Sequence, residues 1–147
     1  MKIAIRYQSR GGNTRAIAEA IAKAAGVKAE PIDTPLTELV DLLFIGGGVY
    51  MWDIDKSLRG YLEGLNPDIV KSAAAFSTAG SMNGTGKIAA IIKSLGITVL
   101  DEALPMKVLT RNHAWLGGKG SITLSDKETK KIEDFVEKVT GLYRKRV

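Results

Sequence analysis

The sequence predicts an α/β fold in which a single doubly wound parallel sheet of five strands is covered by helices on both faces. Strand-like and helix-like segments alternate about five times along the 147 residues, which is typical of this class. Two strand-like runs, residues 41–50 and 72–81, begin with nearly unbroken apolar stretches, as expected for strands buried on both faces. No linker, repeat or low-complexity segment interrupts the alternation, so we expect one domain over residues 1–147.

The first half of the chain predicts three strands and two helices. Residues 2–7 are a β-prone run, and a helix is expected from about Thr14 to Ala25, ended by Gly26. A second strand is expected at 27–32, where Pro31 suits a strand end or an edge. The third strand, at 41–50, is followed by a helix over 54–65.

The second half continues the same pattern. A buried strand at 72–81 precedes a helix at 86–96, and residues 97–109 contain the material of the last strand. The chain closes with a long helix over 125–146. Ser125 is expected to cap this helix, because acidic residues follow it in the first turn.

The composition argues against several kinds of chemistry. The chain has no cysteine, which removes thiol nucleophiles, disulfides and cysteine-bound metals. Its one histidine, His113, makes a histidine-ligated metal site or a Ser-His-Asp triad unpersuasive. No signal sequence is evident, and no apolar run reaches the ~20 residues that a bilayer span requires. We therefore expect a cytoplasmic protein without membrane insertion.

The chain is basic, with a formal net charge of +5. Such a balance can attract nucleic acid, a membrane or an acidic protein. Most of the cations are spread along the sequence, apart from the pair Lys130–Lys131 and a cluster near the C-terminus. We interpret them as solvated helix residues and as a cluster that favours a helix C-terminus, so nucleic acid is not an expected partner.

Three unusual loops follow the first, third and fourth predicted strands. We name them the first loop (residues 9–14, SRGGNT), the second loop (46–55, GGGVYMWDID) and the third loop (77–86, STAGSMNGTG). Strands of a parallel sheet end at the same edge, and open α/β sheets bind ligands there. The sequence therefore predicts a ligand site made by these loops.

The first loop has the features of a phosphate site. A helix N-terminus offers unpaired backbone N–H groups and a partial positive charge. Gly11 and Gly12 allow the backbone to curve around an anion, and Ser9, Asn13 and Thr14 add side-chain donors. The alternative is an ordinary helix cap in a tight turn, which needs fewer such residues.

The first loop and the helical run TRAIAEAIA after it resemble the phosphate-binding loop of flavodoxins, T/S-x-T-G-x-T. The similarity extends through the second and third loops and is weakest from Leu109 to Ile122. It implies a flavodoxin-like sheet in the order 2-1-3-4-5, non-covalent FMN and electron transfer between redox partner proteins. One departure is Gly11, where the family usually has a hydroxyl residue.

The resemblance also implies which residues bind FMN. The phosphate is expected at the first loop, on Ser9, Arg10, Gly11, Gly12, Asn13 and Thr14. The second loop is expected to cover the flavin ring with Val49, Tyr50, Met51 and Trp52. Trp52 is the expected stacking residue and Tyr50 or Met51 its substitute, whereas a core position for Trp52 is the alternative. The third loop is expected to offer Thr78, Ala79, Gly80 and Ser81 to the pyrimidine side. No catalytic residue and no metal are expected.

The second loop also predicts redox tuning. Flavodoxins commonly turn a peptide of this loop toward the flavin, and glycine makes that turn easy. Residues 51–55 contain no glycine, so a positive φ there is expected to be costly. Asp53 and Asp55 are expected either to disfavour a negatively charged reduced flavin or to cap the helix that begins near Ile54.

Residues 109–121 are polar and glycine-rich, and they carry His113 and Trp115. One interpretation is a lid or docking loop near the flavin, in which His113 titrates near neutral pH. The alternative is a surface loop with one buried tryptophan. Neither interpretation gives His113 a catalytic role.

Three functions remain open from the sequence. The first is a small FMN electron carrier, a monomer or weak dimer; the basic charge argues against it, because carrier flavodoxins are usually acidic. The second is an FMN-dependent NAD(P)H reductase of a quinone or small acceptor, although no segment that would hold the nicotinamide nucleotide is evident. The third is a flavodoxin-like interaction module that has lost FMN.

Overall fold

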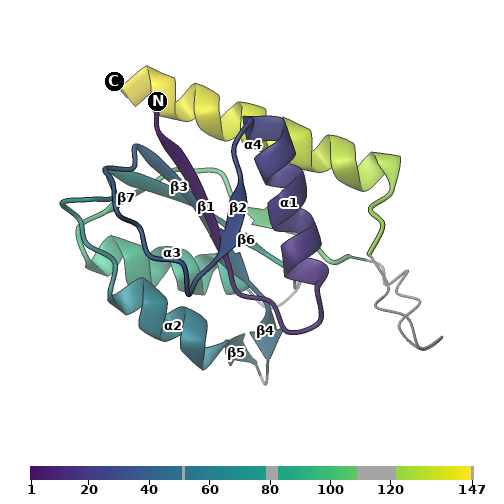
Figure 1. Cartoon of the computed structure of the whole chain (residues 1–147), viewed down its shortest axis with the longest axis horizontal. Coiled ribbons are helices and arrows are strands. Elements are labelled where there is room, and N and C mark those ends of the chain that lie inside the picture. Colours follow the sequence, from purple (N-terminus) through teal and green to yellow (C-terminus); the bar gives the residue numbers. More distant parts are fainter. Residues whose placement is uncertain (51, 79–82, 109–121, 147) are drawn as a thin grey trace.

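A parallel β-sheet forms the middle layer of the protein in the computed structural model, which describes residues 1–50, 52–78, 83–108 and 122–146 (Figure 1). The strand order is β2-β1-β3-β6-β7, and β8 also pairs with β6. These strands are β1 (Ile3–Tyr7), β2 (Ala29–Pro31), β3 (Leu42–Gly47), β6 (Ser72–Ser77), β7 (Thr98–Val99) and β8 (Leu104–Pro105). Counted along the main sheet, the expected order 2-1-3-4-5 is confirmed.

The fifth expected strand is divided into β7 and β8. β7 pairs with residues 72–73 of β6, and β8 pairs with residues 76–77. Residues 74–75 of β6 lie opposite residues 100–103, so the outer chain has extra residues and bulges. Pro105 lacks an N–H group, which is tolerated on this edge.

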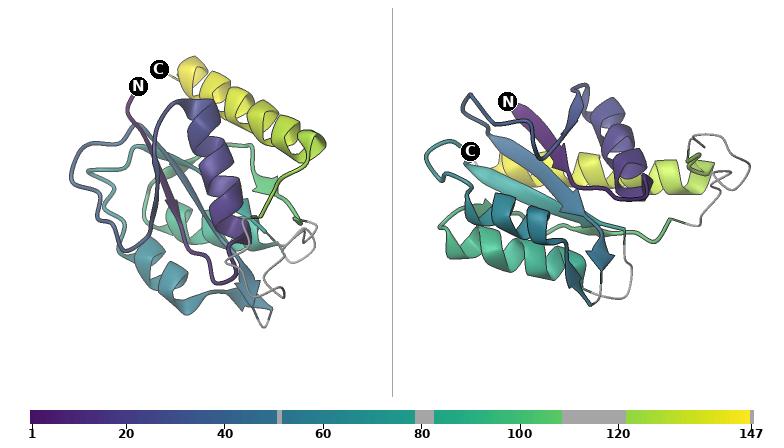
Figure 2. Two further views of the ribbon diagram at one scale, coloured as in Figure 1. Left: turned by 45° about the vertical axis from the view of Figure 1, so that its right-hand side comes forward. Right: turned by 60° about the horizontal axis from the view of Figure 1, so that its bottom comes forward.

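Helices cover both faces of the sheet (Figure 2). α1 (Asn13–Ala25) and α4 (Asp126–Arg146) lie on one face, and α2 (Lys56–Glu63) and α3 (Gly84–Ser94) lie on the other. Neighbouring residues of β3 serve the two cores: Phe44 meets Phe135 of α4 edge-on at 5.7 Å, whereas Leu43 packs with Leu58 and Ile88. None of the helices in these described ranges has both the length and the apolar character needed to cross a bilayer.

The local signals at the helix ends are confirmed. Gly26 adopts φ 73° after α1 and donates its N–H to the Ala22 carbonyl. Ser125 and Glu128 form a reciprocal cap at the start of α4, with N···O distances of 2.8 and 3.1 Å. Both caps are made by residues that are close in the sequence, so they depend on local sequence alone.

The second loop departs from the expected course. The third strand was expected to continue to Tyr50, but β3 ends at Gly47. A separate antiparallel hairpin follows, formed by β4 (Val49–Tyr50) and β5 (Asp53–Ile54). We call residues 49–54 the β4–β5 hairpin. The chain turns out of the sheet here, so the hairpin stands beside the sheet edge where the ligand site is expected (Figure 1).

Candidate functional site

The three loops meet at the carboxyl edge of the sheet. They follow β1, β3 and β6, which are direct neighbours. The hydroxyls of Thr14 and Thr78 lie 3.3 Å apart and join the first loop to the third. Arg10 Nε donates to Asp55 Oδ2 at 2.8 Å and joins the first loop to the second. The fold therefore brings the predicted site together from segments far apart in the sequence.

The N-terminus of α1 points into this junction without a side-chain cap. Gly12 occupies the cap position with φ 93°, and within the described residues this cap makes no side-chain hydrogen bond. The Ser9 hydroxyl instead accepts the Gly12 N–H at 3.0 Å, which closes the turn before the helix. The helix start is therefore left open toward an anion.

Asn13 and the two glycines test whether a phosphate fits here. Asn13 Oδ1 is buried and has no hydrogen-bond partner among the described residues, and turning the amide would present a donor instead. A Cβ on Gly12 would lie 3.2 Å from Ile122 Cδ1, and its positive φ also favours glycine. A Cβ on Gly11 would meet no atom of the described residues within 4 Å. The open helix start, the hydroxyls and the space over Gly11 fit a phosphate group.

Arg10 is positioned differently from the expectation that it adds a cation to the phosphate. Its guanidinium pairs with Asp55 at 2.6 Å and lies 3.9 Å from the centroid of the Tyr50 ring. Asp55 is nearly buried and caps α2 by accepting from the Ser57 N–H. The Ser57 hydroxyl, its backbone N–H and Arg10 together lower the pKa of Asp55, against the effect of burial. Arg10 thus attaches the first loop to the start of α2.

The two aromatic side chains of the β4–β5 hairpin have different surroundings. Tyr50 lies under Arg10, and its hydroxyl is 2.8 Å from where a Cβ of Gly48 would stand. Trp52 is 75% exposed. The alternative of a core position for Trp52 is therefore wrong. Of the two aromatic side chains, the indole of Trp52 is the exposed one.

Trp52 has the positive φ that was expected to be costly in this stretch without glycine. It adopts φ 70°. The pairing of Tyr50 with Asp53 leaves a two-residue connection, and such hairpins favour turns with positive φ. A left-handed conformation at a non-glycine residue costs about 1–2 kcal/mol. Other contacts of the hairpin must offset this cost.

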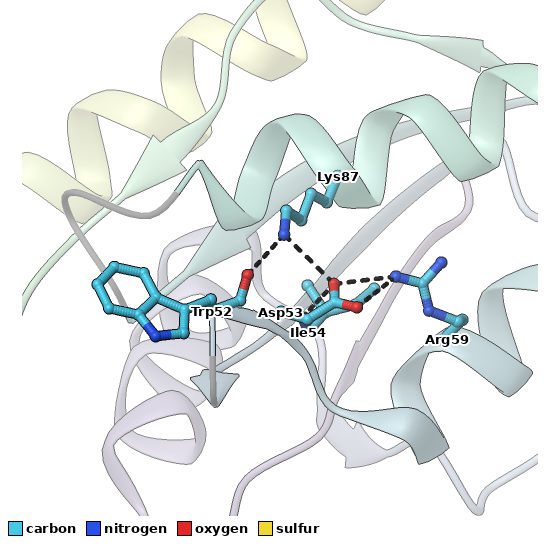
Figure 3. A network of polar contacts seen from close by, with 5 residues as sticks. All are labelled: Trp52, Asp53, Ile54, Arg59 and Lys87. Carbon is cyan, nitrogen blue, oxygen red and sulfur yellow. Dashed lines mark hydrogen bonds and ion pairs between the residues drawn. The ribbon is translucent and has the colours of Figure 1, made fainter.

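A polar network supplies those contacts (Figure 3). Lys87 Nζ of α3 donates to the Trp52 carbonyl at 2.6 Å and lies 3.4 Å from Asp53 Oδ1. Arg59 of α2 donates to both oxygens of Asp53 at 2.9 Å. The Ile54 N–H, followed by Arg59 and Lys87, lowers the pKa of Asp53. The hairpin is thereby tied to two helices.

The cap that was the alternative role of the two aspartates is confirmed for Asp55, and the network gives both of them cation partners. Each is paired with at least one cation, so neither acts as a free negative charge beside the site. Only Asp55 caps α2, which begins at Lys56 rather than near Ile54. Sequence reasoning missed Lys87 and Arg59, because nothing in the sequence distinguishes them from solvated helix residues.

Close packing fixes the hairpin against α3. A Cβ on Gly84 would lie 2.7 Å from Val49 Cγ2 and 3.2 Å from the Ser77 side chain. Val49, an expected site residue, thus packs on the first turn of α3. Among the expected site residues, Met51, Ala79, Gly80 and Ser81 lie outside the described residues, as do His113 and Trp115. In the part of the chain that is described, no acidic or histidine cluster could hold a metal ion.

Comparison with known proteins identifies the family. The flavodoxin domain matches residues 4–119 of this chain. No curated protein gives a significant match to the sequence.

Solved structures share the fold at low sequence identity. Flavodoxin 2 from Bacillus cereus is 15% identical with a TM-score of 0.71, and each chain is covered completely. The rubredoxin oxygen:oxidoreductase from Desulfovibrio gigas is 14% identical with a TM-score of 0.71; 97% of this chain matches, but it spans only 36% of that protein. The apo form of an NADH:FMN oxidoreductase (EmoB) is 13% identical with a TM-score of 0.60, covering 94% of this chain and 88% of that one.

The domain match covers most of the chain and includes all three loops. The sheet order and the open N-terminus of α1 agree with it. The chain therefore belongs to the flavodoxin family, a family of flavoproteins whose cofactor is FMN.

Proposed function

We propose that this protein carries electrons between redox partner proteins on an FMN bound at the junction of the three loops. The observation that carries the proposal is the meeting of the Thr14 and Thr78 hydroxyls, 3.3 Å apart, beside the uncapped start of α1. Two hydroxyls and a helix N-terminus at one point suit a terminal phosphate. When bound, FMN supplies the redox chemistry itself.

The chain's own residues bind and orient the cofactor. The backbone N–H groups of α1 and the Thr14 hydroxyl hold the phosphate, and Asn13 adds a donor when its amide turns. The exposed indole of Trp52 covers a face of the flavin ring. Arg10 supports the site indirectly, because its charge is already paired with Asp55.

A second candidate is an FMN-dependent NAD(P)H reductase of a quinone or small acceptor. The net charge of +5 favours it, since it is unlike the acidic charge usual in carrier flavodoxins. In the carrier proposal the same charge makes acidic proteins the expected partners. We further propose that the protein works in the cytoplasm as a monomer or weak dimer, which light scattering of the purified protein tests.

The absorbance spectrum of the purified protein tests the proposed function. We expect a flavin spectrum, and we expect the released flavin to have the mass of FMN. A protein that neither contains nor takes up flavin would rule the proposal out. Incubation of the loaded protein with NADH or NADPH separates the two candidates: a carrier leaves the nicotinamide unoxidised without an added reductase, whereas a reductase oxidises it.

A further inference from the structure

The backbone of Trp52 is held in place by something other than its own side chain. The residue is left-handed with φ 70°, yet its indole is 75% exposed. Figure 3 shows the indole extending away from Lys87 and Arg59. Packing of the indole therefore does not impose this conformation, and the contacts made by the backbone must do so.

Lys87 makes the contact that fixes the Trp52 peptide. Its Nζ lies 2.6 Å from the Trp52 carbonyl oxygen and 3.4 Å from Asp53 Oδ1, so the carbonyl is the closer partner. Asp53 has a separate cation in Arg59, which contacts both of its oxygens. The bond from Lys87 to the carbonyl thus has a role that the Asp53 ion pairs do not supply.

Lys87 is attached to a fixed part of the molecule. The next residue, Ile88, and Ile92 one turn later are fully buried in the core beneath α3. The first turn of α3 also contacts the hairpin directly, at Gly84 and Val49. The lysine therefore connects the hairpin turn to a helix that cannot move without disturbing the core.

We propose that Lys87 is a positioning residue for the flavin ring. By donating to the Trp52 carbonyl, it holds the β4–β5 hairpin and the indole of Trp52 in the orientation that receives the ring before FMN binds. The part of this role that concerns FMN rests on the proposed function, whereas the effect of Lys87 on the hairpin does not require FMN. Preorganisation of this kind strengthens binding because less order has to be gained on association.

The first experiment measures the hairpin in flavin-free protein. Trp115→Phe leaves Trp52 as the only tryptophan, and this single variant is the parent. In the parent background, Lys87→Met is expected to lower the fluorescence anisotropy of Trp52, whereas Lys87→Arg preserves it because a donor remains. Lys93→Met on the same helix is the matched control. Equal anisotropy in Lys87→Met, Lys93→Met and the parent would overturn the proposal.

The second experiment measures FMN affinity in the same four proteins and in Asp53→Asn. We expect Lys87→Met to raise the Kd by about tenfold, the low end for a hydrogen bond from a charged donor, because Lys87 is partly exposed. Lys87→Arg should restore most of the affinity. Asp53→Asn removes the ion pairs and keeps the carbonyl bond, so it should change the Kd much less than Lys87→Met.

Two results of the second experiment count against the positioning role. An unchanged Kd in Lys87→Met would show that Lys87 has no role in FMN binding. An equal loss of affinity in Asp53→Asn would show that Lys87 acts through its ion pair with Asp53. Failure of the parent itself to bind FMN would instead refute the proposed function and the FMN part of this proposal. The anisotropy comparison would still decide whether Lys87 holds the hairpin, so the two failures are distinguishable.

Discussion

Gly12 and Trp52 both have positive φ, 93° and 70°, but the chain reaches this conformation in two different ways. Gly12 adopts it without steric cost and opens the helix start to an anion. Trp52 adopts it against its own preference, inside a two-residue hairpin connection whose carbonyl is bonded by Lys87. The backbone conformation of a residue at this edge is thus determined either by its own side chain or by the contacts that its neighbours make.

Replacing the two hydroxyls that meet at the helix start is expected to weaken FMN specifically. Thr14→Val and Thr78→Val each remove a donor to a charged phosphate, worth about 1.5–3 kcal/mol, so the Kd for FMN should rise roughly tenfold or more. Riboflavin lacks the phosphate, so its Kd should hardly change. Fluorescence titration measures both, with the exposed Thr37→Val as the control. Equal losses for both flavins would show that the hydroxyls support the fold and not the phosphate.

Two substitutions of Trp52 separate its side chain from its backbone strain. Trp52→Ala and Trp52→Gly both remove the indole, so both should weaken FMN and increase the fluorescence of the bound flavin. Only glycine removes the cost of the positive φ, so Trp52→Gly should be more stable than Trp52→Ala by about 1 kcal/mol in urea unfolding. If the alanine variant were as stable as the glycine variant, the left-handed backbone would not be a source of strain.

At the scale of elements, the site is made by a helix start, a hairpin and two flanking helices. The start of α1 is the proposed phosphate site, and α2 and α3 each supply one cation to Asp53. The hairpin itself has two residues per strand, too few to be stable alone. Its conformation therefore depends on the packing of α3 and on the polar network.

Gly84 tests this packing, because it is where the hairpin touches α3. A methyl group at Gly84→Ala would lie 2.7 Å from Val49 Cγ2, so one element must shift, at a cost of about 1–3 kcal/mol. Gly60→Ala in α2 meets nothing within 4 Å and should instead stabilise by about 0.5–1 kcal/mol. Urea unfolding compares the two. A neutral Gly84→Ala would mean that the hairpin adapts without strain.

At the scale of the whole molecule, paired carboxylates favour the folded state at neutral pH. The pKa values of Asp41, Asp53 and Asp55 are all lowered, chiefly by hydrogen bonds from the Lys2 N–H, the Ile54 N–H and the Ser57 hydroxyl. A carboxylate whose pKa is lower when folded stabilises the protein above its unfolded pKa of about 4. This contribution disappears as the pH falls through the folded value, so stability should decrease below pH 4.

Asp55→Asn isolates one of these contributions. Asparagine keeps the helix cap but loses the ion pair with Arg10, so the variant should be less stable at pH 7 by about 1 kcal/mol, since Arg10 is partly exposed. The difference should decrease as the pH falls below about 4 and disappear once the pH is below the lowered pKa of Asp55, where the native aspartate is protonated as well. Urea unfolding at a series of pH values from 7 downward measures it. A difference that does not decrease below pH 4 would mean that the Asp55 charge is not its source.

The fold class followed from local patterns that are repeated along the chain. The alternation of segments, the buried runs in β3 and β6, the Gly26 stop and the Ser125 cap each depend on residues within a few positions of one another. The first loop belongs to the same group, because two glycines directly before a helix already predict a helix N-terminus that can accept an anion. These features could be predicted because their physics is local.

The tertiary structure decided what the local patterns left open. The partners of Trp52 and Arg10 are Lys87 and Asp55, which lie 35 and 45 positions away along the chain. The two parts of the fifth strand are likewise defined only by their pairing with β6. The sequence by itself determined the sheet and the helices, and it predicted the proposed anion site at the start of α1. Which charges pair, which aromatic side chain is exposed and which residue is strained depend on contacts that exist only after distant segments have packed together.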